Sequence, residues 1–170
     1  MLSTNSQFYT SIIKTSSGLI QGTSTYFHNT RVNQYLGIPF AEPPVCRLRF
    51  QKTQPVKPWD GILVANKPGS ACVQYVDYPY PWYDMYGPKS EDCLYLNIWV
   101  PQSLQNYAKK AVLFWIHGGG YTTGSNQLPV YNGVALAVEG DIIVVTVNYR
   151  LSALGFLTTP SETAPGNAGK

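Results

Sequence analysis

The sequence predicts an α/β fold, in which a small antiparallel N-terminal sheet precedes the first strands of a mostly parallel central sheet. Two apolar runs, at 111–116 and 141–147, are typical of strands buried on both faces of a parallel sheet. Between them, residues 131–139 have helical spacing and end at Gly140. A strand, a helix and a strand in this order form a βαβ unit with a right-handed crossover.

Short strands are predicted in the N-terminal part of the chain. Segments 11–14 and 19–26 flank a polar turn at 16–18, which is a hairpin signal. Residues 32–38 predict a third strand of the same small sheet. The proline-rich segment 41–58 cannot hold a long regular element.

Two segments complete the prediction of secondary structure. Apolar and more polar side chains alternate along residues 92–100, which predicts a strand bounded by Pro101. Residues 151–170 are expected to be mostly loop, because Pro160 and Pro165 interrupt regular structure.

Length and charge narrow the classes of protein that fit. A chain of 170 residues suggests one domain. The net charge of +3 comes from 12 basic and 9 acidic residues that are scattered, so neither nucleic acid nor an anionic membrane is an expected partner. No apolar run reaches the length of a transmembrane helix, and residues 1–10 do not have the pattern of a signal peptide.

A glycine loop, residues 117–124, follows the apolar run at 111–116 and begins His117-Gly118-Gly119-Gly120. Consecutive glycines cost backbone entropy and therefore need a reason. An oxyanion hole supplies one, because two backbone N–H groups must converge on one point and a Cβ would block the approach of substrate. The loop therefore predicts acyl-transfer chemistry.

The glycine loop does not fit the common phosphate-binding loops. The dinucleotide fingerprint that starts at Gly118 and Gly120 needs a third glycine where Thr123 stands, and a P-loop needs a lysine where Ser125 follows Gly124. The histidines and cysteines lack the spacing of metal ligands. They are His28, His117, Cys46, Cys72 and Cys93.

Several motifs together resemble the type-B carboxylesterases and cholinesterases, a branch of the α/β-hydrolase fold. Besides the glycine loop, they lie at 36–44 (LGIPFAEPP), 90–98 (SEDCLYLNI), 147–150 (VNYR), 155–157 and 166–169. The G-x-S-x-G motif of that family is absent. The resemblance therefore implies that residues 1–170 are a partial domain, truncated before the nucleophile elbow and lacking the catalytic Ser, acid and His.

The resemblance also assigns roles within the site. The N–H groups of Gly119 and Gly120 would form the oxyanion hole, while His117 and Gly118 shape the loop. The segment between Cys72 and Cys93 is rich in tyrosine and tryptophan and is called the aromatic loop. Trp82, within it, is similar to the cation-binding tryptophan of cholinesterases and is a candidate substrate contact. The alternative for this tryptophan is plain packing within its loop.

Further pairs implied by the resemblance are structural. Cys72 and Cys93 would form a disulfide around the aromatic loop. Two salt bridges would join Arg49 to Glu91 and Arg150 to Asp92, in place of an acid/base role for these adjacent carboxylates. Cys46 occupies a place where the family has glycine and is expected to be buried, and His28 is expected to be an ordinary loop residue.

The expected function is hydrolysis of a small-molecule carboxylic ester by a serine nucleophile through an acyl-enzyme, without metal or cofactor. This chain by itself is expected to be inactive. The alternatives are a non-catalytic binding protein of the neuroligin type and a truncated gene product without function. The family and the pair of Cys72 and Cys93 suggest a secreted or endoplasmic reticulum protein, and the oligomeric state stays open.

Overall fold

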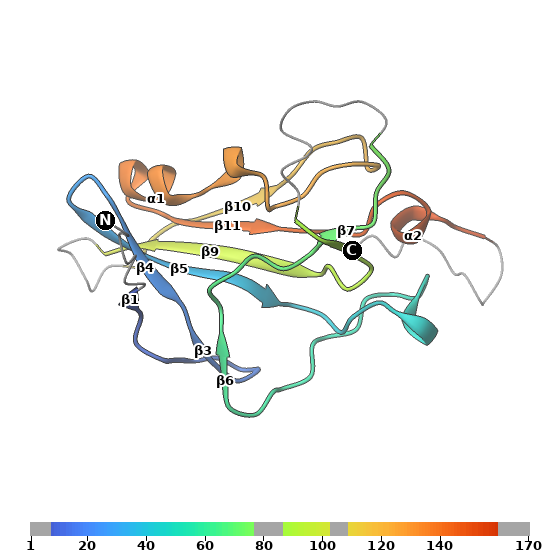
Figure 1. The fold of residues 1–170 in the computed structure, drawn as a ribbon, viewed down its shortest axis with the longest axis horizontal. Coiled ribbons are helices and arrows are strands. Elements are labelled where there is room, and N and C mark those ends of the chain that lie inside the picture. The colour runs from blue at the N-terminus through green and yellow to red at the C-terminus, as the bar shows by residue number, and fades with distance from the viewer. Residues whose placement is uncertain (1–7, 77–86, 103–108, 160–170) are drawn as a thin grey trace, which may run out of the picture.

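The computed structural model describes residues 8–76, 87–102 and 109–159. A six-stranded sheet has the order β1-β4-β5-β9-β11-β10, in which β10 and β11 pair in parallel and the other neighbours are antiparallel (Figure 1). Its strands are β1 (Phe8–Tyr9), β4 (Thr23–Phe27), β5 (Thr30–Pro39), β9 (Tyr95–Pro101), β10 (Val112–Ile116) and β11 (Ile143–Val147).

Two smaller sheets accompany it. The hairpin predicted around residue 17 is confirmed: β2 (Ile13–Lys14) pairs antiparallel with β3 (Leu19–Gln21). In the structure the third strand of this sheet is β6 (Ile62–Val64), which pairs in parallel with β3, so the sheet is mixed where an antiparallel sheet was predicted. A separate two-stranded sheet joins β7 (Ala71–Cys72) to β8 (Lys89–Ser90).

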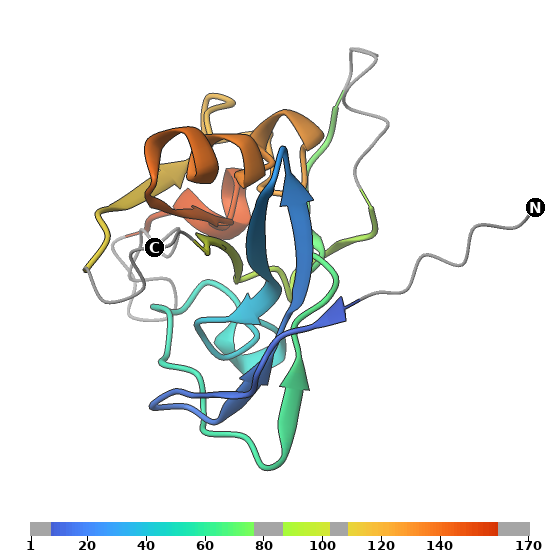
Figure 2. The ribbon, with the colours of Figure 1, turned by 90° about the vertical axis from the view of Figure 1, so that its left-hand side faces the viewer.

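The strand predicted at 32–38 belongs to the main sheet, in contrast to the prediction. It is part of β5, which is buried on both faces. Val32 packs with the helix α1 (Val134–Gly140) on one face, and Tyr35 packs with Ile20 of the small sheet on the other. A strand with apolar contacts on both faces needs a layer on each side, and only a central position provides both. Figure 2 shows α1 and the small sheet on opposite sides of this strand.

The strand predicted at 111–116 forms as β10, but it is not buried on both faces. Phe114 is 55% exposed and Ile116 is 62% exposed. The chain returns from α1 on the β9 side, so that β11 takes the inner position and Val144 and Val145 are buried there. Within the described residues, β10 is therefore an edge strand, and the double burial expected of both runs holds only for β11.

The helices differ from the prediction at their ends. Residues Pro129–Tyr131 form a 3-10 turn, η2, and α1 begins at Val134, three residues later than predicted. Asp141, with φ of 48°, takes the left-handed position after the helix that was expected of Gly140. A short helix, α2 (Ser152–Phe156), interrupts the segment predicted as loop. No helix in the described part of the chain is long and apolar enough to span a membrane.

Candidate active site

An open, mainly apolar cavity of about 910 Å³ lies where β10 and β11 end. Gly118, Gly119 and Gly120 line it, together with aromatic side chains. Among the described residues that line it, only His117 and the tyrosines have ionisable side chains. A neutral, apolar molecule fits such a lining better than an ion does.

The backbone of the glycine loop adopts conformations that need glycine. Gly119 has φ of 123° and Gly120 has φ of 60°, both in the region that side chains disfavour. A Cβ on Gly119 would lie 2.0 Å from the Thr123 carbonyl oxygen. The chain can therefore turn this tightly only with glycine at position 119.

Within the glycine loop, the carbonyl oxygen of Gly119 is bound by N–H groups of the same loop. The backbone N–H groups of Thr122 and Thr123 both donate to the Gly119 carbonyl oxygen, at 3.1 and 3.0 Å. The peptide bond is trans, so the Gly120 N–H points away from that carbonyl. Within the described residues, no acceptor takes the N–H of Gly119 or of Gly120. Both donors are thus unused beside the cavity.

His117 lies under the loop and is 3% exposed. Its Nδ1 lies 2.9 Å from the Gly118 carbonyl oxygen, which makes Nδ1 the protonated nitrogen of the neutral ring. Its Nε2 is buried and has no partner within the described residues. Burial lowers the pKa of His117, so the ring is neutral at physiological pH.

Gly124 closes the loop against this histidine. It has φ of 119°, and a Cβ there would lie 2.3 Å from His117 Nδ1. The geometry makes His117 part of the packing that shapes the loop.

Two aromatic residues that sequence reasoning did not single out support the loop. The Tyr149 ring stacks on His117, and the rings of Tyr121 and Phe156 lie 5.1 Å apart. The Ser152 N–H donates to the Tyr121 carbonyl oxygen at 2.8 Å, which fastens α2 to the loop. Burial raises the pKa of Tyr149. Tyr149 and Phe156 lie in the motifs 147–150 and 155–157 of the resemblance, but neither motif indicated a role for them in the site.

Buried amide side chains hold the segments beneath the cavity, and sequence reasoning missed them too. Asn148 accepts the Asn126 N–H at 2.8 Å and donates to the Ser70 carbonyl oxygen at 3.0 Å. Asn97 donates to the Asn126 carbonyl oxygen at 3.3 Å. Gln74 bonds both backbone groups of Gly124. An asparagine that follows a buried apolar strand, as Asn148 follows β11, is the one local signal.

The disulfide between Cys72 and Cys93 is present, as the resemblance implied. It joins the end of β7 to the segment before β9, so the chain between them is closed into a loop. Trp82 lies outside the described residues, and its role stays a prediction. Cys46 is exposed, which corrects the expectation of burial. Its φ of 52° is a conformation that glycine adopts without strain.

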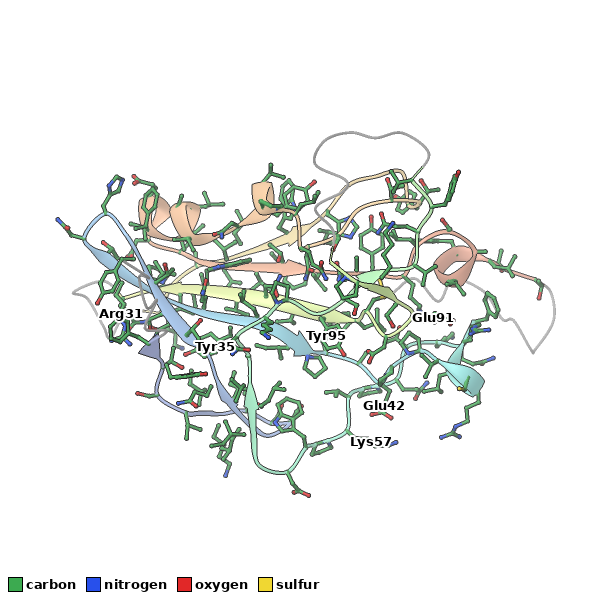
Figure 3. The ribbon with its side chains drawn as sticks, in the orientation of Figure 1. Arg31, Tyr35, Glu42, Lys57, Glu91 and Tyr95 are labelled. Carbon is green, nitrogen blue, oxygen red and sulfur yellow. A yellow bond between two sulfur atoms is a disulfide. The ribbon has the colours of Figure 1, made fainter. Side chains whose placement is uncertain are left out.

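Arg49 and Glu91 form the bidentate pair that the resemblance implied, with Nε to Oε2 at 2.6 Å and NH2 to Oε1 at 2.5 Å. Arg49 follows the 3-10 turn η1 (Cys46–Leu48), and Glu91 lies at the same end of the sheet (Figure 3). This hydrogen-bonded contact raises the pKa of Arg49. Both side chains are partly exposed.

The second predicted bridge, between Arg150 and Asp92, does not form. Arg150 is 3% exposed, and its NH2 donates instead to the Gln51 carbonyl oxygen at 2.9 Å and to Thr53 Oγ1 at 3.1 Å. Burial lowers the pKa of Arg150. Asp92 faces Tyr95, and burial together with this carboxylate raises the pKa of Tyr95 to about 12. Neutral oxygens of 51–53 thus replace the expected carboxylate at the guanidinium.

In the ranges that the structure describes, no three His, Cys, Asp or Glu side chains lie close enough to hold a metal ion.

Comparison with known proteins places this site in context. A model of the carboxylesterase family matches residues 9–170. The chain is 45% identical over 168 residues to acetylcholinesterase-1 of Trittame loki, covering 96% of this chain and 30% of that protein. It is 46% identical to acetylcholinesterase of Electrophorus electricus, covering 92% of this chain and 26% of that protein. For cholinesterase of Mus musculus the identity is 44%, covering 93% and 27%. The chain thus spans less than a third of the length of these relatives.

Proposed function

This chain belongs to the carboxylesterase family, and from that we propose that the protein it forms part of hydrolyses carboxylic esters at the cavity beside the glycine loop. The observation that carries the proposal is the pair of unused N–H groups of Gly119 and Gly120. Donors that are already oriented and not bonded to the protein can bind an oxygen that becomes negative during the reaction.

The proposed reaction uses these donors in the transition state. A hydroxyl nucleophile attacks the ester carbonyl carbon, the carbonyl oxygen becomes an alkoxide, and the N–H groups of Gly119 and Gly120 stabilise it. The alcohol then leaves, and water releases the acyl group from the nucleophile. The nucleophile, the acid and the base would come from polypeptide outside these residues, because the sequence contains no G-x-S-x-G motif.

The lining of the cavity suggests the class of substrate. Phe40, Phe114 and Phe156 offer an apolar surface to an acyl or alcohol group, and the pKa of His117 keeps that ring neutral. The relatives are named acetylcholinesterase and cholinesterase. Simple acetyl and butyryl esters, which are neutral like the lining, are therefore the first substrates to test, and choline esters are tested beside them because of the names of the relatives.

The test measures ester hydrolysis by the full-length protein and compares two alanine variants. Gly119→Ala places a Cβ against the Thr123 carbonyl oxygen and is expected to lower kcat by about 10²–10³-fold, the cost of one oxyanion donor. Gly61→Ala is the matched control. Its φ of 76° also lies in the region that side chains disfavour, but no atom lies within 4 Å of the new Cβ. Activity in the parent and in Gly61→Ala, with a loss confined to Gly119→Ala, is the expected result.

Two further results bear on the alternatives. A phosphonate directed at serine should label the full-length protein and abolish turnover, and the chain of residues 1–170 alone should hydrolyse no ester above background. A full-length protein with neither turnover nor phosphonate labelling would overturn the proposal in favour of a non-catalytic binding protein. Turnover by residues 1–170 alone would overturn the assignment of the nucleophile to other polypeptide.

A further inference from the structure

Gln74 makes an unusually complete contact with the glycine loop. Its Oε1 accepts the Gly124 N–H at 2.8 Å, and its Nε2 donates to the Gly124 carbonyl oxygen at 2.8 Å. The side chain thereby binds both polar groups of one loop residue, as a neighbouring strand would. Gln74 is only 8% exposed, so water does not compete readily for these bonds.

The segment that carries Gln74 is itself anchored. Two residues earlier, Cys72 lies in β7 and is joined by the disulfide to Cys93. Gln74 Nε2 also donates to the Cys72 carbonyl oxygen at 3.1 Å, which limits the rotamers of the amide. The contact on Gly124 thus rests on a covalently fixed segment that lies outside the glycine loop.

The position of Gly124 is transmitted to the candidate oxyanion donors. Gly124 directly follows Thr123, whose N–H holds the Gly119 carbonyl oxygen at 3.0 Å. That carbonyl sets the plane of the peptide that carries the Gly120 N–H. Gly124 also packs against His117, at the other end of the loop. A shift of Gly124 therefore moves both ends of the turn that aims the donors.

We propose that Gln74 is a positioning residue for the oxyanion loop: it holds Gly124, and through it the Gly119–Gly120 peptide, in the orientation that binds the transition state. The inference rests on the proposed esterase function. Gln74 does not line the cavity among the described residues and so acts through Gly124, not by touching substrate.

The kinetic test compares two variants of the full-length protein. Gln74→Met keeps the length of the side chain but loses both bonds to Gly124, and kcat is expected to fall by about 10²-fold, the scale of a misplacement near 1 Å, with KM within about twofold of the parent. Gln34→Met is the matched control, since Gln34 bonds Thr23 Oγ1 on β4, away from the loop. It should leave kcat unchanged. A folded Gln74→Met with the kcat of the parent would overturn the inference.

A conservative variant separates positioning from a general structural role. Gln74→Glu keeps an acceptor for the Gly124 N–H and, as the neutral acid, can also donate to the Gly124 carbonyl oxygen. It should retain at least about tenfold more kcat than Gln74→Met, because one or both bonds remain. If Gln74→Met does not fold, Gln74→Glu takes its place in the kinetic test, and a lowered kcat with a KM within about twofold of the parent supports positioning. Failure of both variants to fold would overturn positioning in favour of a purely structural role.

Hydrogen exchange keeps this inference distinct from the esterase proposal. Amide exchange in the peptide that covers 117–124 should be faster in Gln74→Met than in the parent and unchanged in Gln34→Met, whether or not the protein turns over ester. Faster exchange in a protein without esterase activity would refute the esterase proposal alone. Unchanged exchange together with unchanged kcat would refute the role of Gln74 alone.

Discussion

The Tyr149 hydroxyl donates to the His117 carbonyl oxygen at 2.8 Å, while the Tyr149 ring stacks on the His117 imidazole with the centroids 4.5 Å apart. His117 directly follows β10 and Tyr149 lies two residues after β11, so this contact joins the ends of the two parallel strands. The glycine loop begins at this junction. The foundation of the candidate site is thus a pair of aromatic residues at neighbouring strand ends.

Tyr149→Phe should keep the stacked ring and lose the hydrogen bond. We expect the free energy of unfolding of the full-length protein to fall by about 1 kcal/mol, the usual net value of one such bond. Chemical unfolding measures this change. Tyr26→Phe is the control, because Tyr26 is 61% exposed on β4. Equal stabilities of the parent and Tyr149→Phe would contradict the role of the hydroxyl.

The stability of the fold should depend on pH through His117. Burial lowers its pKa in the folded state, so between that value and about 6.5 the unfolded chain binds a proton that the folded chain does not. The free energy of unfolding should therefore fall as the pH is lowered through this interval, and His117 should contribute no slope above it.

Unfolding measured between pH 8 and pH 5 checks this dependence. In His117→Gln the slope contributed by this residue should disappear, whatever the change in absolute stability. His28→Gln provides a matched control at a histidine whose side chain is 73% exposed. Parallel pH profiles for the parent and His117→Gln would refute the prediction.

Removal of the disulfide should be costly. The variant with serine at both Cys72 and Cys93 should lose about 3 kcal/mol of stability, since the bond closes a loop with a sequence separation of 21 residues. Unfolding of the oxidised protein in denaturant measures the loss. Cys46→Ser should have the stability of the parent, because that cysteine is exposed and unpaired. If Cys46→Ser lowered the stability as much as the double serine variant does, closure of the loop would not be the cause.

The edge strand β10 should make the chain of residues 1–170 associate with itself. Val112, Phe114 and Ile116 are 58%, 55% and 62% exposed on a strand that pairs on one side only within the described residues. Phe114→Lys should lower the association measured by sedimentation or light scattering. Tyr26→Lys, on the inner strand β4, should not. A chain that is monomeric at high concentration would contradict this prediction.

Local sequence patterns predicted the elements well where the driving force is local. The apolar run at 141–147 became the buried strand β11, and the hairpin between β2 and β3 formed around its polar turn. The helix was found with an error of three residues at its start, where Pro129 favoured a 3-10 turn instead. These features depend on the periodicity and turn chemistry of a few neighbouring residues.

The errors concern contacts between distant segments. Arg150 binds neutral oxygens at 51–53 where a bridge to Asp92 was expected, since the approach of that segment is a property of the whole fold. Similarly, no pattern near Gln74 indicated its bonds with Gly124, which lies 50 residues away. Long-range pairing of polar side chains has no period in the sequence.

By itself, the sequence determined that an apolar strand runs into a loop of consecutive glycines, because the apolar run and the conformations open only to glycine are both local properties. Only the tertiary structure decided that β11 lies between β9 and β10, and that Gln74 and Tyr149 hold the loop from two sides. The physical reason is that strand order and side-chain anchoring depend on which distant surfaces bury one another, and that is settled only when the whole core packs.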